Sequence, residues 1–154
     1  MKNLKYFLSF LLLILLMFVN VFEVFAMNTG FTVVDSFTEE EKEHIISVTN
    51  LKLLKEEPVN EAIQCFDVNE DGLIAIGTIH MDERYICVYS SDGIFQYGYR
   101  FDCEGAFGIE FKDENVNIYF VRSDIVKCVN PEGKIIEIAK IQDTIDNDRY
   151  SNYV

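Results

Sequence analysis

Between Cys65 and Gly77 the sequence reads CFDVNEDGLIAIG, in which a turn of Asn, Glu, Asp and Gly separates two apolar runs. Asn, Asp and Gly favour tight turns because they tolerate positive φ angles, and the flanking Ile, Val and Phe favour strands. The pattern continues through YICVYS and, after a Ser-Asp-Gly turn, through IFQYGYRF. These segments predict a unit of four antiparallel strands at about residues 62–102.

A second unit with the same order of segments follows at residues 107–142. Its strand-like runs are FGIEF, VNIYFV, IVKCV and KIIEIAKI. Gly93 and Gly133 occupy the same turn of the two units, and Cys87-Val88 and Cys128-Val129 fall at matching points of the third strands. A repeat of four antiparallel strands every ~40–45 residues is the spacing of a β-propeller blade. The sequence therefore predicts a mainly β fold, with two propeller-blade-like four-stranded antiparallel units after an N-terminal hydrophobic helix.

The units resemble blades of the NHL or WD40-like β-propellers, whose turns carry an Asp-Gly before an apolar strand, as at Asp71-Gly72. The chain has no Trp, so the Trp-Asp signature of that group is absent. The runs CFDVNEDGLIAIG and YFVRSDIV (Tyr119–Val126) also resemble uncharacterised exported or membrane-tethered proteins of low-GC Gram-positive bacteria. That resemblance implies a longer chain, so a truncated member of such a family is one expectation.

Residues 1–26 have the organisation of a membrane-targeting segment. Lys2 and Lys5 form a basic start, and Tyr6–Phe22 is apolar apart from one Ser and one Asn. Val24-Phe25-Ala26 then offers a cleavage site of the signal-peptide type. The apolar run is near the lower limit for a bilayer-spanning helix and longer than most signal h-regions.

Two interpretations of this segment therefore stay open. One is a cleaved signal peptide, which gives a secreted protein. The other is a signal anchor that holds the chain in the cytoplasmic membrane through residues 6–25. Both put residues 27–154 outside the cytoplasm, because the positive-inside rule keeps the two lysines within it.

The chain between the targeting segment and the first unit, residues 27–60, is expected to connect the two. Thr38, followed by Glu41 three residues later, forms a capping-box pattern at the start of a helix. The expected elements are a short strand at Phe31–Val34, a helix at about 39–47 and a strand at about 50–55. The two blade-like units span 61–143, and residues 144–154 form a polar tail.

Charge and cysteine content exclude several functions. The chain has 26 Asp and Glu against 13 Lys and Arg, a net charge of −13, which opposes nucleic-acid binding because phosphates must be neutralised by clustered basic residues. No CxxC occurs, which disfavours zinc or thiol-redox chemistry. In an exported protein the four cysteines form two disulfides, with three possible pairings, or remain core thiols. They are Cys65, Cys87, Cys103 and Cys128.

One motif has a possible metal-binding interpretation. Asp67, Asn69 and Asp71 occupy the first three ligand positions of an EF-hand-type calcium loop. Thr78 stands where a bidentate Glu is needed, and a strand rather than a helix follows. The same letters suit a hairpin turn, so calcium is the minor alternative and no cofactor is expected.

Catalytic signals are few. His80 lies near Asp82 and Glu83, but no nucleophile elbow, zinc-protease motif or phosphate-binding loop accompanies it. An extracytoplasmic hydrolase whose site is completed by another chain is therefore the alternative rather than the leading hypothesis.

Two further patterns predict structural roles. Four aromatic residues, Phe95, Tyr97, Tyr99 and Phe101, are expected on one face of a strand, packed in the core. Arg122, among apolar neighbours, is expected to pair with Asp124 or Glu110.

Two blade-like units cannot close a propeller ring, and exposed sheet edges invite association. Either residues 31–57 complete the core, or the protein pairs with itself or with a protein partner through open sheet edges. The sequence thus favours a non-enzymatic exported module that binds or interacts, with a degenerate fragment of a longer protein as a further alternative.

Overall fold

The computed structural model describes residues 31–59 and 62–142. The predicted N-terminal hydrophobic helix and the polar tail lie outside these ranges. None of the helices in these ranges could span a lipid bilayer. The elements are, in chain order, β1 (Val33–Val34), α2 (Glu39–Val48), β2 (Lys52–Leu54), β3 (Ile63–Val68), β4 (Ile74–His80), β5 (Glu83–Tyr89), β6 (Phe95–Asp102), β7 (Phe107–Lys112), β8 (Asn115–Phe120), the 3₁₀ turn η1 (Val121–Ser123), β9 (Ile125–Val129) and β10 (Ile135–Ile141).

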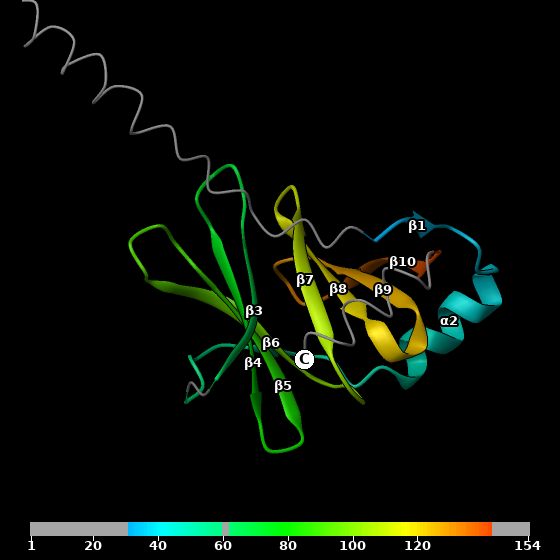
Figure 1. Ribbon diagram of the computed structural model, residues 1–154, viewed down its shortest axis with the longest axis horizontal. Helices are drawn as coiled ribbons and strands as arrows, with labels where there is room; N and C mark the ends of the chain where they lie inside the picture. The colour runs from blue at the N-terminus through cyan, green and yellow to red at the C-terminus, as the bar shows by residue number, and fades with distance from the viewer. Residues whose placement is uncertain (1–30, 60–61, 143–154) are drawn as a thin grey trace, which may run out of the picture.

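The fold is mainly β and consists of two antiparallel five-stranded sheets (Figure 1). Sheet 1 has the strand order β2-β6-β5-β4-β3, and sheet 2 has the order β1-β10-β9-β8-β7. Each sheet is a meander of four consecutive strands joined by short turns, with one additional short strand. The first strands of the two meanders, β3 and β7, are each at one edge of their sheet and lie side by side.

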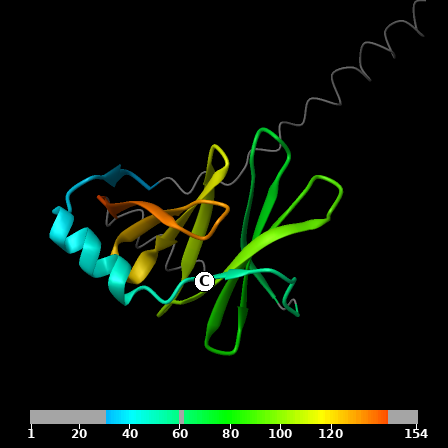
Figure 2. The same cartoon turned by 180° about the vertical axis from the view of Figure 1, so that it is seen from behind.

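The four-stranded units expected from the sequence are thus five-stranded, because the N-terminal segment pairs with both. In β2, Leu53 pairs with Tyr99 of β6; in β1, Val33 pairs with Ile141 of β10. Both meanders would otherwise end in an unpaired edge, which is open to association. Figure 2 shows the segment after α2 passing from the sheet 2 side of the molecule to sheet 1, which lets one short stretch cover both edges.

The turns between the third and fourth strands of the two meanders have the same hydrogen bonds. Ser90 pairs with Ile94 as Asn130 pairs with Lys134, and Gly93 and Gly133 both have positive φ, at 77° and 78°. This match places Cys87 at the position of Lys127, and Val88 at that of Cys128. The sequence-based match of Cys87 with Cys128 is therefore wrong by one residue, which in a strand means the opposite face.

The core lies between the two sheets. Phe101 of sheet 1 packs edge-to-face on Phe107 and Phe120 of sheet 2, with ring centroids 5.2 and 5.6 Å apart. The sheets approach closely at Gly77, where a Cβ atom would lie 2.5 Å from the Cys65 sulfur and 2.9 Å from the Phe107 ring. Glycine in a strand interior commonly marks such an approach. The fully buried members of this core include Tyr99, Phe101, Ile86, Ile109, Ile118, Val88, Val116 and Val129.

The alternation expected for the aromatic residues of β6 holds for three of the four. Tyr99 and Phe101 are buried in the core, and Tyr97 packs against it. Phe95 instead pairs with Tyr89, because a β-bulge interrupts the register between these residues and the Val88–Tyr97 pair. The extra residue turns the Phe95 side chain to the opposite face. There its ring lies edge-on to that of Tyr89, with the ring centroids 6.0 Å apart.

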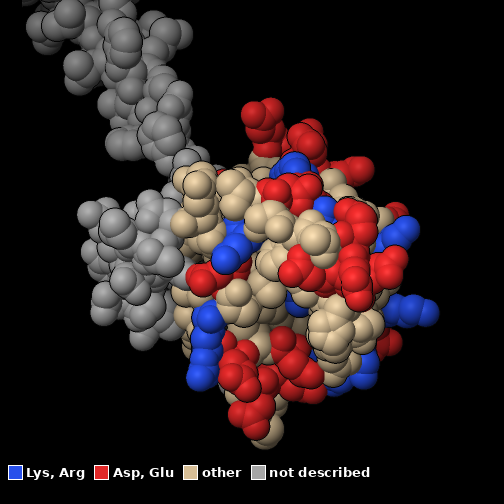
Figure 3. Space-filling view, turned by 90° about the vertical axis from the view of Figure 1, so that its right-hand side faces the viewer, with Lys and Arg blue, Asp and Glu red and all other residues tan. Residues whose placement is uncertain are grey.

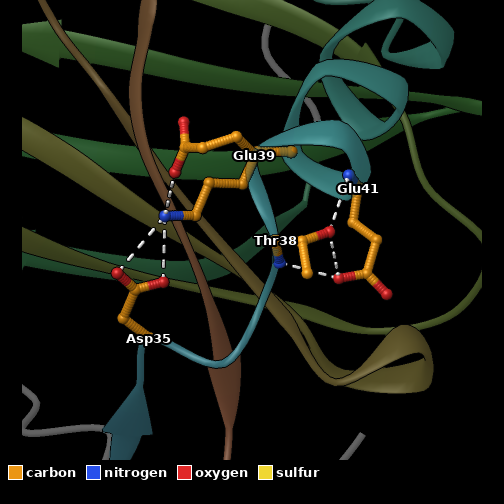
Figure 4. A network of polar contacts seen from close by, with 5 residues as sticks. Asp35, Thr38, Glu39 and Glu41 are labelled. Carbon is orange, nitrogen blue, oxygen red and sulfur yellow. Dashed lines mark hydrogen bonds and ion pairs between the residues drawn. The ribbon is translucent and has the colours of Figure 1, made fainter.

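Helix α2 begins as its sequence predicts. The Thr38 hydroxyl accepts a hydrogen bond from the Glu41 amide at 3.3 Å, and the Glu41 carboxylate accepts one from the Thr38 amide at 2.7 Å (Figure 4). Lys42 adds ion pairs with Asp35 and Glu39 at 3.0 and 3.2 Å. No residue of α2 is fully buried, and only Lys42 and Ile45 are partly buried.

Candidate functional site

Sheet 1 has one face in the core and a second face, called here the outer face, that points away from sheet 2. Strand register places Phe66, Ile76 and Cys87 in one row across this face. A second row holds Ile63, Thr78 and Tyr85. Ile63 is 61% exposed and Phe66 45% exposed. The first row is therefore apolar, whereas the second also holds polar side chains and continues to Arg100; two large apolar side chains of the face are in contact with solvent.

Part of the outer face is covered by the chain itself. Glu57, which follows β2, accepts a hydrogen bond from the hydroxyl of Tyr89 in the central strand β5 at 2.7 Å. Cys87 and Tyr89 are accordingly buried. The exposed part of the face is the half nearest β3.

The hairpin turn predicted at the β3–β4 connection is formed. The Asn69 side chain accepts a hydrogen bond from the Leu73 amide at 2.8 Å and donates one to the Asp113 carbonyl at 3.3 Å. Gly72 has a positive φ of 80°, as this turn requires. Because the Asn69 side chain is engaged in these two bonds and β4 follows the turn, the segment has the conformation of a hairpin rather than that of an EF-hand loop.

Asp67, Asn69 and Asp71 nevertheless share one cavity of about 640 Å³. It lies between the β3–β4 and β7–β8 turns, which Figure 1 shows at the same end of the molecule. We call it the acidic cavity, and its lining residues are Asp67, Val68, Asn69, Glu70, Asp71, Glu110, Phe111, Asp113, Glu114 and Asn115.

Asp67 joins the two sheets at this cavity. Its Oδ2 accepts a hydrogen bond from the Phe111 amide of β7 at 2.7 Å, whereas its buried Oδ1 makes no hydrogen bond of standard geometry. Burial raises the pKa of Asp67, the amides of Phe111 and Val68 oppose that rise, and the charge of Glu110 adds to it.

The residues considered for catalysis do not converge on a cleft. His80 ends β4 and pairs with Glu83 across the β4–β5 turn. Glu83 is engaged by Arg100 at 2.8 Å and by the Tyr85 hydroxyl. In the part of the chain that the structure describes, no three His, Cys, Asp or Glu side chains are grouped closely enough to hold a metal ion.

Arg122 does not make the ion pair expected of it. It pairs with Glu104 at 3.2 Å rather than with Asp124 or Glu110. The 3₁₀ turn η1 after β8 causes this, because it directs Arg122 toward the loop at Gly105. Both partners are exposed, so the pair contributes about 0–1 kcal/mol.

All four cysteines are free thiols, as one of the two sequence interpretations expected. Burial raises the pKa of the Cys65 thiol to about 12 and that of Cys87 to about 11. Cys103 is partly exposed. Lys127, which occupies the position equivalent to Cys87, is buried beside the Phe120 ring and donates to the Thr49 hydroxyl at 2.8 Å.

The exposure of Phe66 and Ile63 was not anticipated from the sequence, although a signal was present. The strand runs LIAIGTI and YICVY are apolar at nearly every position, which is typical of a sheet that is buried on both faces. Among residues 31–59 and 62–142, one face of sheet 1 packs against sheet 2, and the half of the other face nearest β3 is exposed.

Comparison of the chain with known protein families, with curated proteins and with solved structures finds no match in any of the three. The propeller-like and exported-protein resemblances therefore gain no support from relatives. Two regions stand out by their chemistry, the outer face of sheet 1 and the acidic cavity.

Proposed function

We propose that this chain is an exported, non-enzymatic binding module that associates with a second copy of itself through the outer face of sheet 1. The observation that carries the proposal is the exposure of two large apolar side chains, Ile63 and Phe66, next to each other on the outer face of sheet 1. Large apolar side chains grouped on one surface are characteristic of protein-interaction sites.

In this proposal the two sheets are adjacent propeller-blade-like repeats. Their shared strand order and matching turns support that assignment. It makes Phe66 equivalent to Ile109, and Ile76 equivalent to Ile118. In sheet 2 these two positions are 2% and 0% exposed because sheet 1 covers them. The outer face of sheet 1 thus has the chemistry of a face that another sheet covers.

A second copy fits best with its own sheet 1 against the first, which gives a closed, symmetric pair. A head-to-tail arrangement would need the far face of sheet 2, whose apolar side chains already have cover. There the Tyr119 ring packs against that of Phe31, with the ring centroids 5.2 Å apart, and Val126 and Ile141 are buried.

Charge further disfavours contact through the other side of the molecule. Figure 3 shows many carboxylates, with lysine and arginine among them, on the side where α2, β1 and β10 lie. Strand β1 has only two residues, and short edge strands with nearby charges resist edge-to-edge pairing. The association expected from the sequence at open edges is therefore assigned here to a sheet face.

Site-specific photo-crosslinking of the full chain in its host cell tests the proposal. Benzoylphenylalanine in place of Phe66 is expected to give a covalent product of twice the chain mass, with both halves identified by mass spectrometry. The matched control is the same probe at Val48, which is also exposed but lies on α2, and it is expected to give no such product. Adducts at position 66 with other proteins only, or no adduct at all, would contradict self-association.

Export is tested separately by N-terminal sequencing of fractionated cells. A soluble chain that starts at Met27 would establish release, and an intact Met1 in the membrane pellet would establish an anchor. A full-length chain in the cytosol would contradict both.

A further inference from the structure

A groove lies between the C-terminal end of helix α2 and sheet 2 (Figure 1). Its volume is about 480 Å³, within the range of about 300–1,000 Å³ that is usual for small-ligand pockets. Apolar side chains of α2 and of sheet 2 line it, and Lys127 of β9 lines it with them. They are Ile45, Val48, Phe120 and Ile125. We call this site the α2 groove.

Lys127 interrupts a row of isoleucines on sheet 2. Strand register places Ile109, Ile118, Lys127 and Ile138 side by side on four neighbouring strands, and these residues are 2%, 0%, 8% and 2% exposed. An apolar side chain would suit the position of Lys127, because a buried ammonium group loses its hydration. Burial accordingly lowers the pKa of Lys127. A bound anion would compensate this loss of hydration.

No carboxylate of the described residues neutralises Lys127. None of the ion pairs between these residues includes it. Its ammonium group donates to the Thr49 hydroxyl at 2.8 Å and lies 4.3 Å from the centroid of the Phe120 ring. The Thr49 hydroxyl in turn donates to the Ile45 carbonyl at 2.6 Å. An ammonium group has three protons, so Lys127 retains protons for an anion, and the groups around it line the α2 groove.

The charged and amide groups at the rim of the α2 groove are paired with one another. Asn50 donates a hydrogen bond to the Asp102 carboxylate at 2.7 Å. Arg122 forms an ion pair with Glu104 at 3.2 Å. All four residues are exposed. The α2 groove therefore offers a ligand one buried cation beside aliphatic walls, and few free hydrogen-bonding groups.

We propose that the α2 groove binds a free aliphatic carboxylic acid, with the carboxylate on the Lys127 ammonium and the chain along Ile45, Val48 and Ile125. Charge complementarity selects the head group, because a carboxylate accepts strong, charge-assisted hydrogen bonds from an ammonium group. The aliphatic walls select the chain, which leaves water when it binds. A sugar or a peptide backbone would leave its own polar groups unpaired against these walls.

A binding role also explains why a charge stands in the isoleucine row. Groups that lower the stability of a fold are typical of functional sites, and Lys127 is such a group. The site is independent of the proposed self-association, since it uses α2 and sheet 2 and not the outer face of sheet 1.

Calorimetric titration of the purified full chain with sodium octanoate tests the proposal. Sodium acetate, which lacks the chain, and 1-octanol, which has the same chain without the charge, are the comparison ligands. We expect saturable octanoate binding with a Kd on the order of 0.1–1 mM, as ligand efficiency allows for a ligand of about ten non-hydrogen atoms. Both comparison ligands should bind at least about tenfold more weakly.

Lys127→Met removes the charge from the α2 groove and keeps an unbranched side chain of similar length. It is expected to weaken octanoate binding at least about tenfold. The matched control Lys140→Met removes the same charge from an exposed position outside the groove and should bind as the wild type does. Val48→Glu places a carboxylate on the exposed rim and should weaken binding several-fold, which covers the case in which Lys127→Met fails to fold.

The proposal is overturned if the wild type shows no saturable octanoate binding up to about 10 mM, or if Lys127→Met binds octanoate within about twofold of the wild type. Binding of acetate or 1-octanol as tight as that of octanoate would overturn it too, because the groove would then not recognise the chain or the charge. Sedimentation that shows a wild-type dimer and a Lys127→Met monomer would assign the groove to a second copy, which also overturns the proposal.

Discussion

The two sheets have the same strand order, yet equivalent positions have opposite environments. Phe66 in sheet 1 is 45% exposed, whereas Ile109 at the equivalent position of sheet 2 is 2% exposed. Gly77 in sheet 1 has no side chain because Phe107 packs over it, whereas its equivalent, Tyr119, has room for a ring on the far face of sheet 2. What surrounds a strand thus decides which side chain it can carry, and topology alone does not.

The largest expected difference is in the free energy of unfolding lost when equivalent residues of the two sheets are truncated. Ile109→Ala leaves a cavity in the core and should lower the free energy of unfolding by about 2–5 kcal/mol. Phe66→Ala removes a half-exposed ring and should cost less than about 1 kcal/mol in dilute solution, where copies stay apart. Urea denaturation of both variants measures the difference. Equal losses would show that the outer face is as well packed as the core.

The close approach of the sheets is tested at Gly77. Gly77→Ala should lower the free energy of unfolding by about 1–3 kcal/mol, because its Cβ overlaps the Cys65 sulfur and the Phe107 ring. Adding Cys65→Ala removes the nearer contact and should restore part of the loss in thermal or urea unfolding. A neutral Gly77→Ala would mean that the two sheets are farther apart at this point.

Lys127 places a charge on the buried face of sheet 2, where sheet 1 has Cys87. Burial lowers the pKa of Lys127 from its ordinary value of 10.5, so the unfolded chain binds this proton more tightly than the folded chain does. The free energy of unfolding that this site contributes therefore rises with pH through the lowered pKa, up to about 10.5. At neutral pH the folded protein bears the cost of the buried charge.

Lys127→Met should accordingly raise the free energy of unfolding at pH 7 by up to about 1 kcal/mol, because replacing a buried charge with an apolar side chain of similar volume removes a desolvation cost. The gain should shrink toward pH 10. The hydrogen bond to Thr49 limits its size. Urea denaturation at both pH values checks this, with Lys140→Met as an exposed control. A gain of equal size at both pH values would contradict the assignment to charge burial.

The smallest expected effect concerns thiol labelling. Cys103 is partly exposed and should react with a maleimide in the native protein. Cys87, on the outer face of sheet 1, is 1% exposed and should react only after unfolding, as should Cys65 and Cys128. Peptide mass spectrometry of pulse-labelled protein distinguishes the four. Rapid labelling of Cys87 would mean that the segment containing Glu57 does not cover it.

Local chemistry made part of this fold predictable. The turn at Asn69–Gly72 and the capping box of Thr38 and Glu41 depend on residues only a few positions apart, and both form as expected. The face of Phe95 could not be predicted, because a β-bulge is not evident from simple alternation. The match of Cys87 with Cys128 failed for a related reason, since the register of the turns sets it.

In the acidic cavity, too, only the residues close together in the sequence were predictable. Asp67, Asn69 and Asp71 were identified as a group from spacing, and they do line one cavity. The partners from the other sheet, Glu110 and Phe111, are about forty positions away and gave no local signal.

The sequence by itself determined the β class, the turn positions and the start of α2, because these depend on backbone preferences of neighbouring residues. The tertiary structure decided which faces are covered, how β1 and β2 complete the two sheets, and that Asp67 is buried beside a cavity lined by carboxylates from both sheets. Those outcomes depend on contacts between residues far apart in the chain, and the outer face of sheet 1 is exposed because none of the described elements fully covers it.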